Sequence, residues 1–163
     1  MKNETEFKTT FKKSIKADKG FSISLAAPTI SGVPDLYVIY PGYIPLLLEA
    51  KFLKEVPDRF SRKINYSPLQ KLWLDECNRV NPYTAYGLVG FKWCGQIFCC
   101  LTPFSVTQID YTFATKHAHC AYDPKTKLFD IKCMFEHSYV PKIDFYNNAM
   151  YLTGNKLIAN VPA

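Results

Sequence analysis

Two short groups of residues carry the side chains best suited to chemistry. Residues 32–35 read Gly-Val-Pro-Asp, so that Asp35 follows a proline and begins an apolar run. Fourteen positions later, Glu49 and Lys51 flank Ala50 at the end of a second apolar run. Carboxylate oxygens bind hard divalent cations, and a lysine can stabilise negative charge that develops on a phosphate. These residue types predict metal-dependent hydrolysis of a phosphodiester bond.

Strand geometry explains how these residues would act together. Alternate side chains along a strand share a face, so Glu49 and Lys51 project to one side and Ala50 to the other. Asp35, at the head of the neighbouring strand, can approach Glu49. We expect Asp35 and Glu49 to bind Mg²⁺ or Mn²⁺, with the backbone carbonyl of Ala50 as a further ligand. Glu4, in the first predicted helix, is a candidate third carboxylate, acting through water or on a second ion.

Each short motif also has an ordinary structural explanation. A Pro-Asp pair is common in turns, and a Glu-x-Lys often marks a strand edge. The context favours chemistry, because Glu49 directly follows three leucines, where a charge is costly without a partner or a metal. Gln70 has two interpretations that stay open. It completes a helix capping box with Ser67, and it could also touch a phosphate or a metal-bound water.

The elements that must position these residues follow from apolar spacing and helix start signals. Residues 3–17 predict a helix capped by Asn3. Three strands are predicted at about 21–26, 36–40 and 44–52, and residues 53–66 are predicted to be a mobile loop. A second helix starts at residues 67–68, Ser-Pro. Its expected buried stripe is Leu69, Leu72, Trp73, Cys77 and Val80.

The remaining chain is predicted to extend the same sheet. Residues 86–94 and 96–102 predict two strands, and residues 105–116 predict a short helix. Residues 128–135 predict a further strand, and the end of the chain from about residue 140 favours β-structure. The fold class is therefore α/β, with a mixed central sheet flanked by helices and a β-leaning C-terminal extension.

Composition and charge narrow the class of protein. The 163 residues are 48% hydrophobic and 15% aromatic, which is typical of a folded globular protein. The formal net charge is +6, and residues 51–71 hold six basic groups against two acidic ones. Basic segments beside the carboxylates favour contact with phosphate, although each could be ordinary solvated surface. The nucleic-acid-binding candidates are Lys54, Arg59, Arg62, Lys63 and Lys71.

Cysteines and apolar segments indicate the compartment. Six cysteines without a secretion signal predict reduced thiols. The segment 117–120, His-Ala-His-Cys, is expected to be a surface loop in preference to a zinc site. No apolar stretch approaches the roughly 20 residues that cross a bilayer, and the polar start lacks a signal-peptide core. We expect a soluble cytoplasmic protein, in the host cell if the chain is encoded by a phage.

The order of these motifs resembles a known nuclease superfamily. The motif order resembles that of the PD-(D/E)XK superfamily, which has the restriction-endonuclease-like fold. The motifs are Glu4, then Asp35, then Glu49 with Lys51, and finally Ser-Pro-Leu-Gln at residues 67–70. The Ser-Pro-Leu-Gln helix start is similar to that of VRR-NUC domains and related phage nucleases. The acid of the first helix resembles that of archaeal Holliday-junction resolvases. The resemblance covers about residues 3–95.

This resemblance implies a fold, a reaction and a set of roles. The fold is an αβββαβ core with the active site at one edge of a mixed sheet. It would form a single nuclease domain over residues 1–163, with a core of about 3–102 and an extension of about 103–163. The reaction is Mg²⁺- or Mn²⁺-dependent hydrolysis of nucleic acid. The implied catalytic residues are Glu4, Asp35, Glu49, Lys51 and Gln70.

Three functions from different classes compete. The leading one is a metal-dependent DNA endonuclease, with selectivity for branched DNA as one expectation and a homodimer by analogy. The second is a nucleic-acid-binding protein that keeps the fold without catalysis, against which the intact Asp35, Glu49 and Lys51 argue. The third is a sheet-based interaction protein, which predicts that Asp35 and Glu49 lie apart. Glu6 remains a rival to Glu4 as the helix acid.

Overall fold

The first half of the chain forms the predicted αβββαβ order with one additional short strand, β4, before the second helix. The computed structural model describes residues 1–25, 30–56, 61–138, 140–144, 149–152 and 156–160. The elements of this half are α1 (Glu4–Ala17), β1 (Phe21–Ser24), β2 (Leu36–Ile39), β3 (Leu46–Leu53), β4 (Arg62–Lys63), α2 (Pro68–Val80) and β5 (Ala85–Trp93). Strand β4 corrects the prediction of a continuous loop over 53–66, of which residues 57–60 lie outside the described part.

The second half contains more helix than predicted. Its elements are β6 (Gln96–Thr102), β7 (Gln108–Ile109), α3 (Tyr111–His117), β8 (Cys120–Asp123), β9 (Leu128–Phe129), α4 (Ile131–Glu136), β10 (Lys142–Asp144), β11 (Ala149–Leu152) and β12 (Lys156–Asn160). The helix predicted over 105–116 is confined to α3. In the part of the chain that the structure describes, no helix is long and apolar enough to span a bilayer.

The strand predicted over 128–135 is wrong, and the reason is a helix cap. Strand β9 ends after two residues, and the Asp130 side chain then accepts a hydrogen bond from the backbone N–H of Cys133. The buried residues that follow are Ile131, Met134 and Phe135. Residues 131, 134 and 135 lie on one face of a helix, so α4 can bury all three together. In a strand, residues 134 and 135 would point to opposite faces of the sheet.

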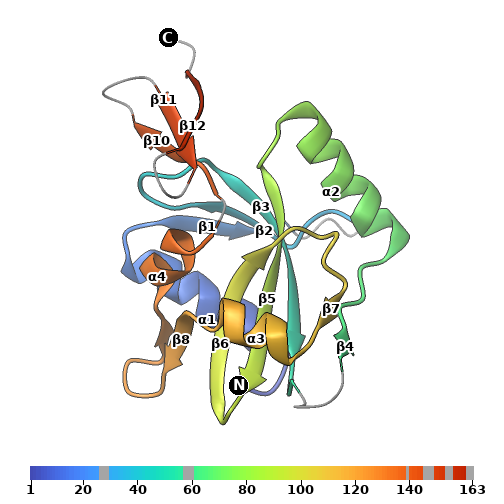
Figure 1. Ribbon diagram of the computed structural model, residues 1–163, viewed down its shortest axis with the longest axis vertical. Helices are drawn as coiled ribbons and strands as arrows, with labels where there is room; N and C mark the ends of the chain where they lie inside the picture. The colour runs from blue at the N-terminus through green and yellow to red at the C-terminus, as the bar shows by residue number, and fades with distance from the viewer. Residues whose placement is uncertain (26–29, 57–60, 139, 145–148, 153–155, 161–163) are drawn as a thin grey trace.

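A seven-stranded mixed sheet forms the centre of the molecule. Its strand order is β1-β2-β3-β5-β6-β8-β9, in which β3 and β5 are parallel and the other neighbours are antiparallel. Parallel neighbours need a crossover connection, and the segment containing α2 provides it. Strands β4 and β7 form a separate small sheet beside α2, and β10–β12 form a third sheet near the C-terminal end (Figure 1). The predicted mixed α/β class is confirmed.

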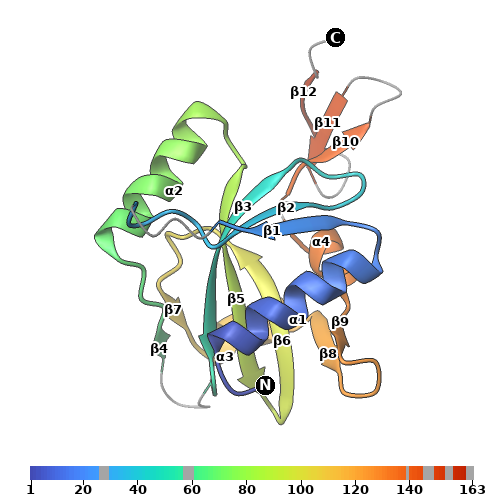
Figure 2. The same ribbon diagram turned by 180° about the vertical axis from the view of Figure 1, so that it is seen from behind.

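Two hydrophobic clusters lie on opposite faces of this sheet. Helix α1 lies across the face seen in Figure 2 and buries Phe7, Phe11 and Ile15. Helix α3 lies over the opposite face, seen in Figure 1, where Ala114 packs in the second cluster. Alternate β5 residues join different clusters: Leu88 lies in the first and Val89 in the second. Both faces of the central strands are therefore covered.

Helix α2 buries less surface than its sequence predicted. Only Leu74 is buried, whereas Leu69, Leu72 and Val80 of the predicted stripe are 48%, 56% and 73% exposed. The helix stands beside the sheet and contacts β5, whereas α1 lies across a face (Figures 1 and 2). An apolar stripe on a helix is buried only where another element packs against it. Among the described residues, the elements packed against α2 bury only Leu74.

A glycine ties the loop before β2 to the start of α2. Gly32 has a φ of +85°, a conformation that side chains of L-residues rarely adopt. A Cβ atom at Gly32 would also lie 2.7 Å from the backbone carbonyl carbon of Leu69. The loop that leads to Asp35 can therefore pack directly against the first turn of α2, which carries Gln70.

Candidate active site

Glu49 and Lys51 project from β3 to the same side of the sheet. Their charged atoms, Oε1 of Glu49 and Nζ of Lys51, are 3.3 Å apart. The Glu49 side chain is only 3% exposed, and the Lys51 side chain is 18% exposed. Ala50 between them packs in the cluster beneath α1. This arrangement follows from the two-residue period of a strand, as the sequence predicted.

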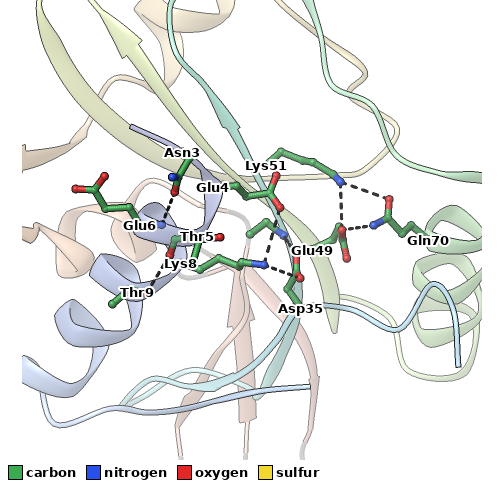
Figure 3. A network of polar contacts seen from close by, with 11 residues as sticks. Asn3, Glu4, Thr5, Glu6, Lys8, Thr9, Asp35, Glu49, Lys51 and Gln70 are labelled. Atoms are coloured by element: carbon green, nitrogen blue, oxygen red, sulfur yellow. Dashed lines mark hydrogen bonds and ion pairs between the residues drawn. The ribbon is translucent and has the colours of Figure 1, made fainter. Parts of the chain in front are cut away.

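Asp35 contacts the part of β3 that extends beyond the end of β2, where the sheet has a local edge. Its Oδ2 accepts a hydrogen bond of 3.0 Å from the backbone N–H of Ala50. Pairing of β2 with β3 ends at Leu36 and Leu48, so Ala50 lies beyond the last paired residue. The N–H and C=O of one strand residue point to the same side, so the Ala50 carbonyl also faces this edge. Figure 3 shows the Glu49 carboxylate beside Asp35, so Asp35, Glu49 and the backbone of Ala50 lie together.

Lys8 is a member of this cluster that the sequence did not predict. Its Nζ atom lies 3.0 Å from Oδ1 of Asp35 and 3.9 Å from Oε1 of Glu4. Glu4 therefore connects to Asp35 through Lys8 (Figure 3). The available signal was the spacing of Glu4 and Lys8, because residues four apart on a helix lie on the same face. A lysine from α1 and a carboxylate before β2 meet only in the folded chain.

Glu6 lies on another side of α1. Its carboxylate accepts a 2.7 Å hydrogen bond from the backbone N–H of Lys2 and lies 3.7 Å from the terminal amine of Met1. Figure 3 shows it directed away from Asp35. Of the two helix acids considered from the sequence, Glu4 is the one beside the carboxylate cluster.

Gln70 completes the predicted capping box and also contacts Glu49, while its predicted contact with a phosphate or a metal-bound water stays a prediction. Its Oε1 accepts a 2.8 Å hydrogen bond from the backbone N–H of Ser67, and its own backbone N–H donates to the Ser67 hydroxyl, which completes the capping box. Its Nε2 donates to Oε1 of Glu49. Its Oε1 is also 3.5 Å from Nζ of Lys51 (Figure 3). The cap therefore holds the amide in position against Glu49.

Tyr66 and Gly87 shape the space beside Glu49, and neither was a predicted site residue. Nζ of Lys51 lies 5.7 Å from the centre of the buried Tyr66 ring. Gly87 is opposite Glu49 in the β3–β5 register, and a Cβ on it would lie 2.0 Å from the Tyr66 hydroxyl oxygen. The tyrosine fits only because position 87 lacks a side chain. The sequence signal was slight: Tyr66 directly precedes the Ser67 cap.

Burial and neighbouring charge change the acidity of Glu49. Burial and, to a smaller extent, the negative charge of Asp35 raise the pKa of its carboxyl to about 7, although Lys51 opposes the rise. Desolvation disfavours the charged form of an acid, and a second carboxylate nearby has the same effect. The two neighbouring negative charges of Asp35 and Glu49 repel each other, so a bound cation between them would be stabilising.

The donor atoms at this edge suit a small, hydrated divalent cation. They are carboxylate oxygens of Asp35 and Glu49 and the carbonyl oxygen of Ala50. Mg²⁺ prefers oxygen ligands, keeps several waters and needs only one or two carboxylates. Within the described ranges, no group of three or more His, Cys, Asp or Glu side chains is arranged to hold a metal. The set therefore fits Mg²⁺ or Mn²⁺ with water completing the shell, and it does not fit a closed zinc site.

The predicted basic residues are distributed along the neighbouring surface. Lys54 is exposed just after β3, Arg62 and Lys63 are exposed on β4, and Lys71 is exposed on α2. Lys63 and Lys71 line a common groove. Arg59 lies outside the described residues. The predicted surface loop at 117–120 is wrong at both ends, because His117 ends α3 and Cys120 begins β8 and is buried.

Comparisons with known proteins find distant structural likeness and no sequence relative. No protein-family model matches the chain, and no curated protein matches it at a significant level. Among solved structures, the chain is similar to Hjc of Archaeoglobus fulgidus, a Holliday junction resolvase from an archaeal hyperthermophile. The match has a TM-score of 0.46 and 14% sequence identity, and it covers 69% of this chain and 89% of Hjc. At that TM-score the likeness does not decide function, which depends on the residues themselves.

Proposed function

We propose that this protein is a nuclease of the PD-(D/E)XK type that uses Mg²⁺ or Mn²⁺ to hydrolyse phosphodiester bonds in DNA. The observation that best supports the proposal is the meeting of Asp35, Glu49 and Lys51 at one edge of the sheet. An interaction protein with unrelated surface carboxylates would not need them together. Glu49 is instead buried, paired with Lys51 and close enough to Asp35 for its pKa to respond.

Each residue has a role in this proposal. Asp35, Glu49 and the Ala50 carbonyl would hold the cation. A bound divalent cation supplies Lewis-acid stabilisation of the phosphate and lowers the pKa of a coordinated water. Lys51, held near Glu49 by the strand, would place its ammonium group against charge that develops on the phosphate. Gln70 fixes the orientation of the Glu49 carboxylate through the capping box.

The substrate form and the assembly are further parts of the proposal. We infer a single nuclease domain over residues 1–163, with branched or junction DNA as the preferred substrate. A homodimer is proposed by analogy with nucleases that must cut two strands. Glu4 would act as the helix acid, through water or through its ion pair with Lys8.

Cleavage assays with charge-neutral variants test the proposal. The substrates are branched, duplex and single-stranded DNA and RNA, each with Mg²⁺, Mn²⁺ or a chelator. Asp35→Asn and Glu49→Gln should each lower the cleavage rate by more than about 100-fold, beyond the usual cost of changes outside the metal ligands. Asp75→Asn, which changes an exposed carboxylate on α2, is the matched control and should cut normally.

The possible results separate the competing functions. Undiminished cutting by both Asp35→Asn and Glu49→Gln would contradict the assigned site. A wild-type protein that binds DNA but cuts no substrate with either metal would favour the non-catalytic alternative. Thermal unfolding of each variant checks that a lost activity is not a lost fold.

A further inference from the structure

A groove beside the carboxylate cluster is lined by residues from both halves of the chain. Its volume is about 350 Å³, within the usual range of ligand-binding clefts, about 300–1,000 Å³. Strand β4 contributes Lys63 to its lining, β7 contributes Gln108, and α2 contributes Lys71. The two strands are held together by a 2.8 Å hydrogen bond from the Ile64 N–H to the Thr107 carbonyl. Residues beyond 102, which the motif pattern did not explain, thus complete this groove.

The chemistry of the groove suits a polyanion that also carries hydrogen-bonding groups. Its exposed rim contains Lys63, Lys71, Asn65 and Gln108, and its floor contains the buried Tyr66. Among the described residues that line it, two are lysines and none is acidic. Lysines provide phosphate contacts, and side-chain amides both donate and accept hydrogen bonds, as base edges require.

The groove lies next to the cluster around Glu49 and shares Tyr66 with it. Tyr66 forms part of its floor, and the ammonium group of Lys51 lies 5.7 Å from the same ring. Lys71, on its rim, directly follows Gln70, which contacts Glu49. A strand whose phosphate lies at the carboxylates would therefore pass into the groove with its neighbouring nucleotide.

We propose that this groove binds the DNA strand next to the phosphate that is cut, with Lys63 and Lys71 on its backbone and Asn65 and Gln108 on a base. This inference rests on the proposed nuclease function for the position of the cut. The binding of DNA in the groove can be tested without measuring cleavage. The segment around β7 then has a function, because Gln108 and Thr107 supply one side of the substrate path.

The test measures binding of the full-length protein to a fluorescein-labelled single-stranded oligodeoxynucleotide by anisotropy, with chelator present to prevent cutting. Lys63→Gln combined with Lys71→Gln should weaken binding and lower the slope of log affinity against log salt by about 1.4, or 0.7 per lost phosphate contact. Lys125→Gln combined with Lys127→Gln is the matched control, since both lysines are exposed in the distant β8–β9 turn. This control should keep the wild-type slope.

A second variant tests the contact with a base. Asn65→Ala combined with Gln108→Ala should keep the salt slope, because no phosphate contact is lost. It should reduce the difference in affinity between oligo-dA, oligo-dC and oligo-dT. A salt slope for the lysine variant equal to that of wild type, or base preferences unchanged in the amide variant, would overturn the groove assignment. Cutting that survives Asp35→Asn would instead contradict the nuclease site and leave the groove result intact.

Discussion

Two carboxylate–lysine pairs lie side by side at this edge of the sheet, and they differ in origin and in exposure. Lys8 and Asp35 come from α1 and from the loop before β2, and their side chains are 27% and 24% exposed. Lys51 and Glu49 are two residues apart on β3, and their side chains are 18% and 3% exposed. One pair is assembled by packing and remains accessible to water, while the other is built into a single strand and is largely buried.

This difference suggests different functions for the two lysines. The half-buried Lys8 pair is more accessible to water than the Lys51 pair, so water screens it more strongly. An arriving cation can therefore displace Lys8 from Asp35 at low cost. Lys51 cannot move far from Glu49, because the strand fixes both. We expect Lys51 to act in the reaction and Lys8 to compensate the charge of Asp35 in the absence of metal.

The largest expected effect is on Lys51. Lys51→Met should lower the single-turnover cleavage rate by roughly 100-fold or more, the usual cost of losing one group that stabilises developing charge. The affinity for Mg²⁺ should change much less, because Lys51 supplies no ligand atom. Cleavage rates at several Mg²⁺ concentrations separate the two quantities. Lys92→Met, a change at an exposed lysine on the neighbouring strand β5, should cut at nearly the wild-type rate. An equal loss in Lys92→Met would show that the effect is not specific to Lys51.

A smaller effect is expected in the pH dependence of folding. The pKa of Glu49 is about 7 in the folded protein and about 4.5 when unperturbed. The unfolded chain therefore loses this proton first as pH rises, so the free energy of unfolding of metal-free protein falls between about pH 4.5 and 7. Glu49→Gln should remove this part of the fall.

Urea unfolding at several pH values across that range measures the effect. Glu136→Gln, which changes an exposed glutamate on α4, should retain the wild-type dependence. An identical pH profile for Glu49→Gln and the wild type would show that burial does not perturb this carboxyl, and the contrast with the exposed pair would then disappear.

The smallest effect is expected for Lys8. Lys8→Met should raise the affinity for Mg²⁺ roughly two- to fivefold, because the cation no longer competes with an ammonium group at Asp35. Calorimetric titration of Mg²⁺ into DNA-free protein measures this directly. Lys12→Met is the matched control on the same helix, since the Lys12 ammonium donates to Ser24 and not to Asp35. Weaker or unchanged Mg²⁺ affinity in Lys8→Met would mean that Lys8 supports the site in some other way.

The sequence by itself determined the features that depend on local periodicity. The two-residue period of a strand placed Glu49 and Lys51 on one face. The Ser-Pro-x-Gln pattern specified the start of α2 and its capping box, and Asn3 specified the start of α1. Because these signals use residues within a few positions of one another, they survive without knowledge of the fold.

Only the tertiary structure decided which distant residues meet. It placed Lys8 against Asp35, Tyr66 in the space left by Gly87, and Gln108 beside Lys63. It also left the apolar stripe of α2 largely exposed, which its helical spacing did not predict. The physical reason is the same in each case: burial and contact depend on which surface another element covers, and local spacing does not contain that information.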